Sequence, residues 1–129
     1  FTIQGPLRYH PGTITVDASA SSQFFSAMLL IAPLLGGAII RSEQKLISLP
    51  HINMTLDMMR ATGITWSKLS GSEWMIEEGK PTASEIKIEA DLSNAGPFLC
   101  AGILSGGRPA NPHWPASSTQ PGAMWPELF

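Results

Sequence analysis

The stretch Asp17-Ala18-Ser19-Ala20-Ser21-Ser22-Gln23 decides the local fold, because it joins two segments of different character. The β-like run Thr13-Ile14-Thr15-Val16 precedes it, and the apolar, helix-like run from Phe24 to Ala32 follows it. The first N–H groups of a helix have no partner within the helix, and the helix dipole makes that end positive. Serine hydroxyls at such a turn either cap the helix or join its free N–H groups around an anion. The residues of the turn leave both uses open.

Composition limits the class of protein. The chain has 129 residues and a net charge of −2, with 43% hydrophobic and 14% charged residues. That length can bury a core, and that composition excludes a disordered tail. A net charge of −2 provides no positive surface potential that would attract nucleic acid. The longest apolar stretch, residues 24–35, is too short to cross a bilayer. One cysteine, Cys100, cannot form an internal disulfide, and no Cys/His spacing indicates a metal site.

Three parts of the chain repeat one order of features: a strand-like run, a polar turn, an apolar helix and glycine. The expected strands are residues 13–16, 45–51 and 86–89, the expected helices are 23–35, 52–62 and 95–104, and the closing glycines are Gly36-Gly37, Gly63 and Gly106-Gly107. Such repetition indicates stacked units that share a core. The first and last helices are apolar nearly all round, so we expect them to lie inside the protein.

Two further features complete the outline. Residues 65–67 and 73–76 flank Ser70-Gly71-Ser72, which predicts a β-hairpin. The chain begins without Met at Phe1-Thr2-Ile3, which is strand-like, and stops just after a possible helix start at Trp125, so both ends look cut. The cations near the turns are spread out, so we expect any phosphate site to be completed by residues outside the chain. These cations are Arg8, Arg41, Lys45, Arg60 and Lys68.

Four segments resemble, in order, motifs of the 5-enolpyruvylshikimate-3-phosphate synthase family. They are the Ser-Ser-Gln run of residues 17–24, the Ser-Leu-Pro-His-Ile run of 48–55, and residues 89–99 and 114–122, the last most similar to actinobacterial members. The resemblance implies an α/β (α+β) enolpyruvyl transferase fold, a two-lobe inside-out barrel built of βαβαββ repeats, of which this chain is a central fragment. Residues 1–88 would then be part of one lobe, and residues 89–129 the start of a unit of the other.

The resemblance also implies an enzyme, 3-phosphoshikimate 1-carboxyvinyltransferase. This enzyme transfers the enolpyruvyl group of phosphoenolpyruvate to the 5-hydroxyl of shikimate 3-phosphate and releases phosphate, in the shikimate pathway of aromatic amino-acid biosynthesis. Its expected partners are these two substrates, with neither nucleic acid nor membrane. It would need no metal or organic cofactor, and the full-length protein would be a cytoplasmic monomer.

Roles transfer to individual residues by the same resemblance. Ser21, Ser22 and Ser48 match the hydroxyls that hold the shikimate phosphate, and Gln23 matches the amide that contacts shikimate and the transferring group. His51 stands where the family often has Tyr against the shikimate ring, and its alternative role is packing or capping. No catalytic acid or base falls in this chain, so the isolated fragment should not turn over. We expect Asp91 to cap the following helix.

Two alternatives stay open from the sequence. The chain could be a non-catalytic fragment or a phosphate-binding structural domain. It could also resemble a UDP-N-acetylglucosamine enolpyruvyl transferase, which shares the fold but lacks the Ser-Ser-Gln match.

Overall fold

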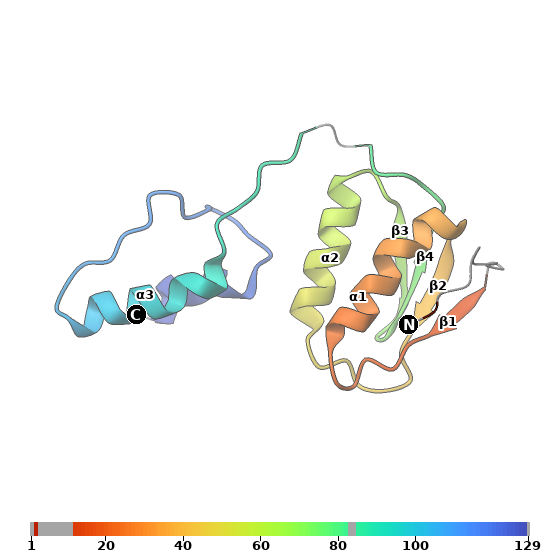
Figure 1. The fold of residues 1–129 in the computed structure, drawn as a ribbon, viewed down its shortest axis with the longest axis horizontal. Coiled ribbons are helices and arrows are strands. Elements are labelled where there is room, and N and C mark those ends of the chain that lie inside the picture. The colour runs from red at the N-terminus through yellow and green to blue at the C-terminus, as the bar shows by residue number, and fades with distance from the viewer. Residues whose placement is uncertain (1, 3–11, 83–84, 129) are drawn as a thin grey trace. The chain divides into compact units, whose positions relative to one another are not determined.

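The chain forms two compact units, Phe1–Ala83 and Ser84–Phe129, in a computed structural model that describes residues 2, 12–82 and 85–128 (Figure 1). The division lies a few residues before the boundary expected at 88/89. That the two units belong to different lobes of a longer protein stays a prediction. The strand expected at Phe1-Thr2-Ile3 lies outside the described residues except for Thr2, which is not in a strand.

The first unit has the order βαβαββ that the family resemblance implies. Its elements are β1 (Thr13–Thr15), α1 (Ser22–Ile31), the 3₁₀ helix η1 (Ala32–Leu35), β2 (Ala38–Arg41), α2 (Leu49–Ala61), β3 (Trp66–Ser70) and β4 (Glu73–Ile76). The sheet order is β1-β2-β4-β3. β1 pairs parallel with β2, and the other neighbours pair antiparallel. Figure 1 shows α1 and α2 side by side over the sheet.

Local sequence explains where α1 begins and ends. Ser21 is the N-cap in extended conformation, and its side chain accepts a hydrogen bond from the N–H of Gln23. Pro33 lacks an N–H and would clash with the preceding helical turn, so the α-helix gives way to η1. Gly36 then closes the segment in the left-handed conformation, with φ of 95°. The helix expected over residues 23–35 is therefore confirmed, with a 3₁₀ last turn.

The second helix and the hairpin also follow the sequence pattern. α2 begins three residues before the expected start because Pro50 fits the first turn of a helix. Its buried residues Ile52, Leu56 and Met59 form one stripe at helical spacing. The expected hairpin is confirmed as β3 and β4, with an irregularity in register between Lys68 and Ser70.

The core of the first unit lies between the sheet and the two helices. Phe25 and Leu29 of α1 are fully buried, as is Ile40 of β2. The Phe25 ring meets the Trp74 ring edge-on, with centroids 5.4 Å apart, which is a favoured aromatic geometry. The indole N–H of Trp66 donates to the carbonyl of Leu56 at 2.8 Å and so ties the hairpin to α2.

The second unit is smaller and consists of helices and turns. It contains α3 (Leu92–Leu104), the 3₁₀ helix η2 (Pro121–Met124) and the short α4 (Trp125–Leu128). α3 begins three residues before the expected start, because Asp91 accepts hydrogen bonds from the N–H and the side-chain amide of Asn94. The capping role expected for Asp91 is confirmed.

Two expected strands are wrong. Residues 86–89 are not in a strand, although their residues alternate, because the described part of the second unit provides no strand to pair with them. Ile88 is 80% exposed there. Residues 45–48 form an irregular connection into α2, and the strand of this part of the chain is β2 instead. β2 lies between β1 and β4, so both of its edges have hydrogen-bonding partners.

The expectation that the first and last helices lie inside the protein is also wrong for the described residues. In α1, Phe24 and Leu30 are more than half exposed, and in α3 the same holds for Phe98 and Leu104. Each helix packs along one side only, because the sheet and one neighbouring helix cover a single face of α1. An apolar composition therefore indicated the capacity for burial, not the burial itself.

Candidate anion-binding site

A pocket of about 460 Å³ lies where the N-terminal ends of α1 and α2 come together. Both helices begin at the same edge of the first unit, as Figure 1 shows. The pocket is lined by Ala20, Ser21, Ser22, Gln23, Ser26, Ile47, Ser48, His51, Met54 and Thr55. All five substrate-binding residues expected from the sequence therefore lie on one pocket: Ser21, Ser22, Gln23, Ser48 and His51. Their substrate contacts stay a prediction.

The serines at α1 combine capping with free donor capacity. The Ser21 hydroxyl oxygen accepts the Gln23 N–H at 3.2 Å, which leaves its own proton able to donate. Ser22 is the first residue of the helix and half-buried. Capping and anion binding, the two uses considered for this turn, are thus compatible at Ser21.

At α2 the corresponding serine has a different partner. Ser48 is the N-cap, yet its side chain makes no capping hydrogen bond. Its hydroxyl oxygen lies instead 2.5 Å from Nδ1 of His51, one turn into the helix. The interaction joins two of the expected site residues.

Two polar residues of the pocket, Ser26 and Thr55, were not among the site residues expected from the sequence. The hydroxyl oxygens of Thr55 and Ser26 lie within hydrogen-bond distance, 3.1 Å apart, and so link α2 to α1 at the pocket. Ser26 follows Ser22 by four residues and Thr55 follows His51 by four, so each pair shares one helix face. A polar pair at that spacing inside apolar helices was the signal that could have identified them.

The helix ends give the pocket its electrostatic character. Neither α1 nor α2 has an acidic residue in its first turn, so no carboxylate offsets the positive end of either helix dipole. Asp17 lies upstream of α1, where hydrogen bonds from the Ser19 hydroxyl and then the Ser19 N–H hold the pKa of its carboxyl below the usual value. None of the described residues that line the pocket is a lysine, arginine, aspartate or glutamate.

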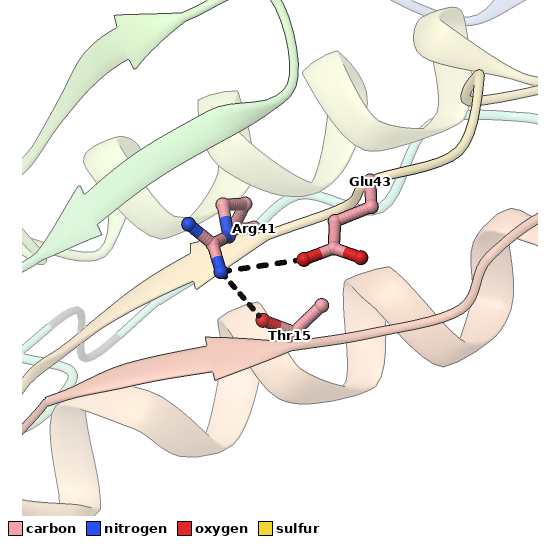
Figure 2. A network of polar contacts seen from close by, with 3 residues as sticks. All are labelled: Thr15, Arg41 and Glu43. Atoms are coloured by element: carbon pink, nitrogen blue, oxygen red, sulfur yellow. Dashed lines mark hydrogen bonds and ion pairs between the residues drawn. The ribbon is translucent and has the colours of Figure 1, made fainter.

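Two of the described cations near the turns, Arg41 and Arg60, contact other side chains. Arg41 donates to the Thr15 hydroxyl at 3.3 Å and pairs with Glu43 at 3.5 Å, as Figure 2 shows. Because its neighbour Ile40 is buried under the helices, Arg41 points to the opposite face of the sheet. Arg60 lies over the Trp66 ring at 4.0 Å. Arg8 lies outside the described residues.

The described residues, 2, 12–82 and 85–128, contain no group of three His, Cys, Asp or Glu side chains that could hold a metal ion. No helix within them has the length and apolar character needed to cross a membrane.

Comparison with known proteins identifies the family. Residues 1–125 match the sequence model of EPSP synthase (3-phosphoshikimate 1-carboxyvinyltransferase). A protein of that name from Kocuria rhizophila is 38% identical over 132 residues, and one from Bifidobacterium longum is 40% identical over 132 residues. These alignments cover 100% and 98% of this chain, and 30% of each relative, so the chain spans under a third of their length. The chain, with one βαβαββ unit and a pocket at its paired helix ends, belongs to the EPSP synthase family.

Proposed function

We propose that this chain is part of a 3-phosphoshikimate 1-carboxyvinyltransferase. The longer protein would join the 5-hydroxyl of shikimate 3-phosphate to the enol carbon of phosphoenolpyruvate, after which phosphate leaves. It would act in the cytoplasm as a monomer and use no metal or organic cofactor. The proposed reaction is supported by the family membership of the chain. The proposal that this chain binds part of the substrate is supported by the pocket at the N-terminal ends of α1 and α2.

The proposed share is the binding of the phosphate of shikimate 3-phosphate. Hydroxyls of Ser21, Ser22 and Ser48 can donate to phosphate oxygens, and the two helix ends add partial positive charge. Gln23 also lines this pocket, and its amide would hold the shikimate ring and the transferring group. Hydroxyl and backbone donors are neutral, so the full clamp on two anionic substrates would need cations from other parts of the longer protein.

A chimaera tests this proposal. Residues 1–129 would replace the matching segment of the Kocuria rhizophila enzyme, and phosphate release from the two substrates would be measured. We expect turnover, and a loss of about tenfold or more for Gln23→Ala, which corresponds to one well-placed polar contact. Gln44→Ala is the matched control, because Gln44 is exposed and outside the pocket.

Each outcome has a distinct meaning. A folded chimaera without turnover would contradict the enzymatic function and favour a structural phosphate-binding domain. Turnover that is equally affected by Gln23→Ala and Gln44→Ala would keep the enzyme but remove Gln23 from its site.

A further inference from the structure

The Ser48 hydroxyl makes no capping hydrogen bond at the start of α2. A hydroxyl at the N-cap normally accepts from the N–H of the second or third helical residue. Here the second residue is Pro50, which has no N–H, and the Ser48 side chain makes no capping bond. Its partner is the His51 ring, at 2.5 Å from Nδ1. What Ser48 can offer to a ligand therefore depends on His51.

That hydrogen bond has two possible directions with opposite consequences. If Nδ1 has no proton, it accepts from the Ser48 hydroxyl, and Ser48 then has no proton for an anion. If Nδ1 carries the proton, it donates to the Ser48 oxygen, and the hydroxyl proton is free for a phosphate oxygen. An anion accepts only, so its binding selects the second direction.

Among the described residues that line the pocket, His51 is the only one with a titratable side chain. α1, which faces α2 across the pocket, has no charged residue. The charged residues on the neighbouring elements all lie outside the lining: Asp17, Arg41, Glu43, Lys45, Asp57 and Arg60. A proton on both ring nitrogens of His51 would therefore place a full positive charge at a pocket whose described lining has no other.

We propose that His51 is a positioning residue for the phosphate, acting through Ser48. Its Nδ1–H donates to the Ser48 oxygen and turns the Ser48 hydroxyl into a donor toward the anion, and binding of the anion is coupled to proton uptake by the ring. This inference rests on the proposed function, since it assigns the phosphate to this pocket. A ring that acted by its charge alone would give a pH dependence that Ser48→Ala leaves entirely unchanged.

The test uses the chain of residues 1–129 with inorganic sulfate as the probe. Sulfate stays doubly charged between about pH 8 and about pH 6, whereas a phosphate monoester titrates near pH 6. Sulfate affinity would be measured by nuclear magnetic resonance, from shifts of the Ser48 amide and the His51 ring. We expect binding about three- to tenfold tighter at the lower pH, where histidine side chains gain charge.

Variants separate the hydrogen bond from the charge. His51→Asn keeps a short side chain that can donate to Ser48 but never takes a proton, so its sulfate affinity should not vary over this pH range. Ser48→Ala should weaken binding at both pH values while keeping some of the pH dependence. His113→Asn is the matched control, because His113 is an exposed histidine of the second unit. It should behave as the unchanged chain does.

Three results would overturn the inference: sulfate that leaves the His51 and Ser48 signals unmoved, binding that does not vary with pH, or a pH dependence that survives His51→Asn. The chimaera described above separates this failure from failure of the proposed function. Turnover there, with the same pH profile of KM for shikimate 3-phosphate in His51→Asn, would keep the enzyme and reject the positioning role. If sulfate binding to the chain depends on pH through His51 but the chimaera has no turnover, the positioning role would stand and the enzymatic function would be rejected.

Discussion

At the scale of single residues, Glu89 shows how one exposed carboxylate can order a segment that has no strand partner. The carboxylate accepts the Ser118 hydroxyl at 2.5 Å and the Gln120 side-chain amide at 2.9 Å. The same Gln120 amide group donates to the carbonyl of Ala90, and its oxygen accepts the N–H of Leu92 at the start of α3. Glu89 thus holds the residue that satisfies a free N–H of the helix.

Because of these hydrogen bonds, we expect the stability of this segment to depend on pH. The Ser118 hydroxyl, and next the Gln120 amide, lower the pKa of Glu89 below its ordinary value of 4.5. A lowered pKa means that the folded chain favours the charged form, so the contribution to stability is present above about pH 4.5 and is lost as the pH falls through the lowered value. We expect the amides at the start of α3 to lose hydrogen-exchange protection in that acid range.

Two variants make the pH test specific to this carboxylate. Above about pH 4.5, Glu89→Gln should have lower protection at the start of α3 than the unchanged chain, and it should show no acid-dependent loss of its own. Glu85→Gln, a change at an exposed glutamate of the same unit, should follow the unchanged chain. If Glu89→Gln loses protection with acid as the unchanged chain does, Glu89 is not the group responsible.

At the scale of elements, α3 packs closely against η2 and α4, and the close contacts are made at two glycines. A Cβ at Gly96 would lie 2.6 Å from the Trp125 ring, and one at Gly122 would lie 2.5 Å from the backbone of Leu92. Side chains do not approach so closely, so both positions require the absence of a Cβ. The helix and the α4 segment can pack here only because these residues are glycine.

Gly96→Ala should therefore destabilise the second unit. Alanine gains about 1 kcal/mol in helix propensity over glycine, but overpacking against an aromatic ring costs about 1–3 kcal/mol. Because ring atoms of Trp125 lie 2.6, 2.7 and 3.1 Å from the position of the new methyl group, we expect the cost to exceed the gain. Tryptophan fluorescence during urea unfolding would measure it. Gly71→Ala is the control, since nothing lies within 4 Å of a Cβ at Gly71, and a more stable Gly96→Ala chain would contradict the packing described.

At the scale of the whole molecule, the two units differ in how much core they bury. Nearly all buried hydrophobic residues belong to the first unit, where they form one cluster around Phe25, Ile40 and Trp74. In the second unit Leu92 is the buried hydrophobic residue among those described. Local stability follows buried contacts, so the units should not open with the same free energy.

Hydrogen exchange should show this difference directly. We expect amides in the middle of α1 and α2 to exchange at least about tenfold more slowly than amides in the middle of α3, because opening the first unit exposes a shared core. Phe25→Ala should then speed exchange in α1, α2 and the sheet together while leaving α3 unchanged. Equal protection in the middle of α1 and α3, or a Phe25→Ala effect that spreads into α3, would show one cooperative core instead.

The sequence predicted which residues come together at the pocket more completely than it predicted the strands around them. The five expected site residues lie on one pocket because each belongs to a turn or first helical turn, and the sequence marks such turns locally. The contact between Ser48 and His51 was not predicted, because it depends on the geometry at the start of α2. The link between Thr55 and Ser26 escaped prediction because it joins two helices that are far apart in sequence.

The sequence by itself determined the elements whose causes are local: the cap at Ser21, the change of helix type at Pro33, the stop at Gly36 and the β3–β4 hairpin. Only the tertiary structure decided that β2 is the strand after α1 and that residues 86–89 are not one. A strand exists through hydrogen bonds to partners elsewhere in the chain, and β2 has them on both edges whereas residues 86–89 do not. The buried faces of α1 and α3 were decided in the same way, because burial depends on what packs against a helix and not on its composition alone.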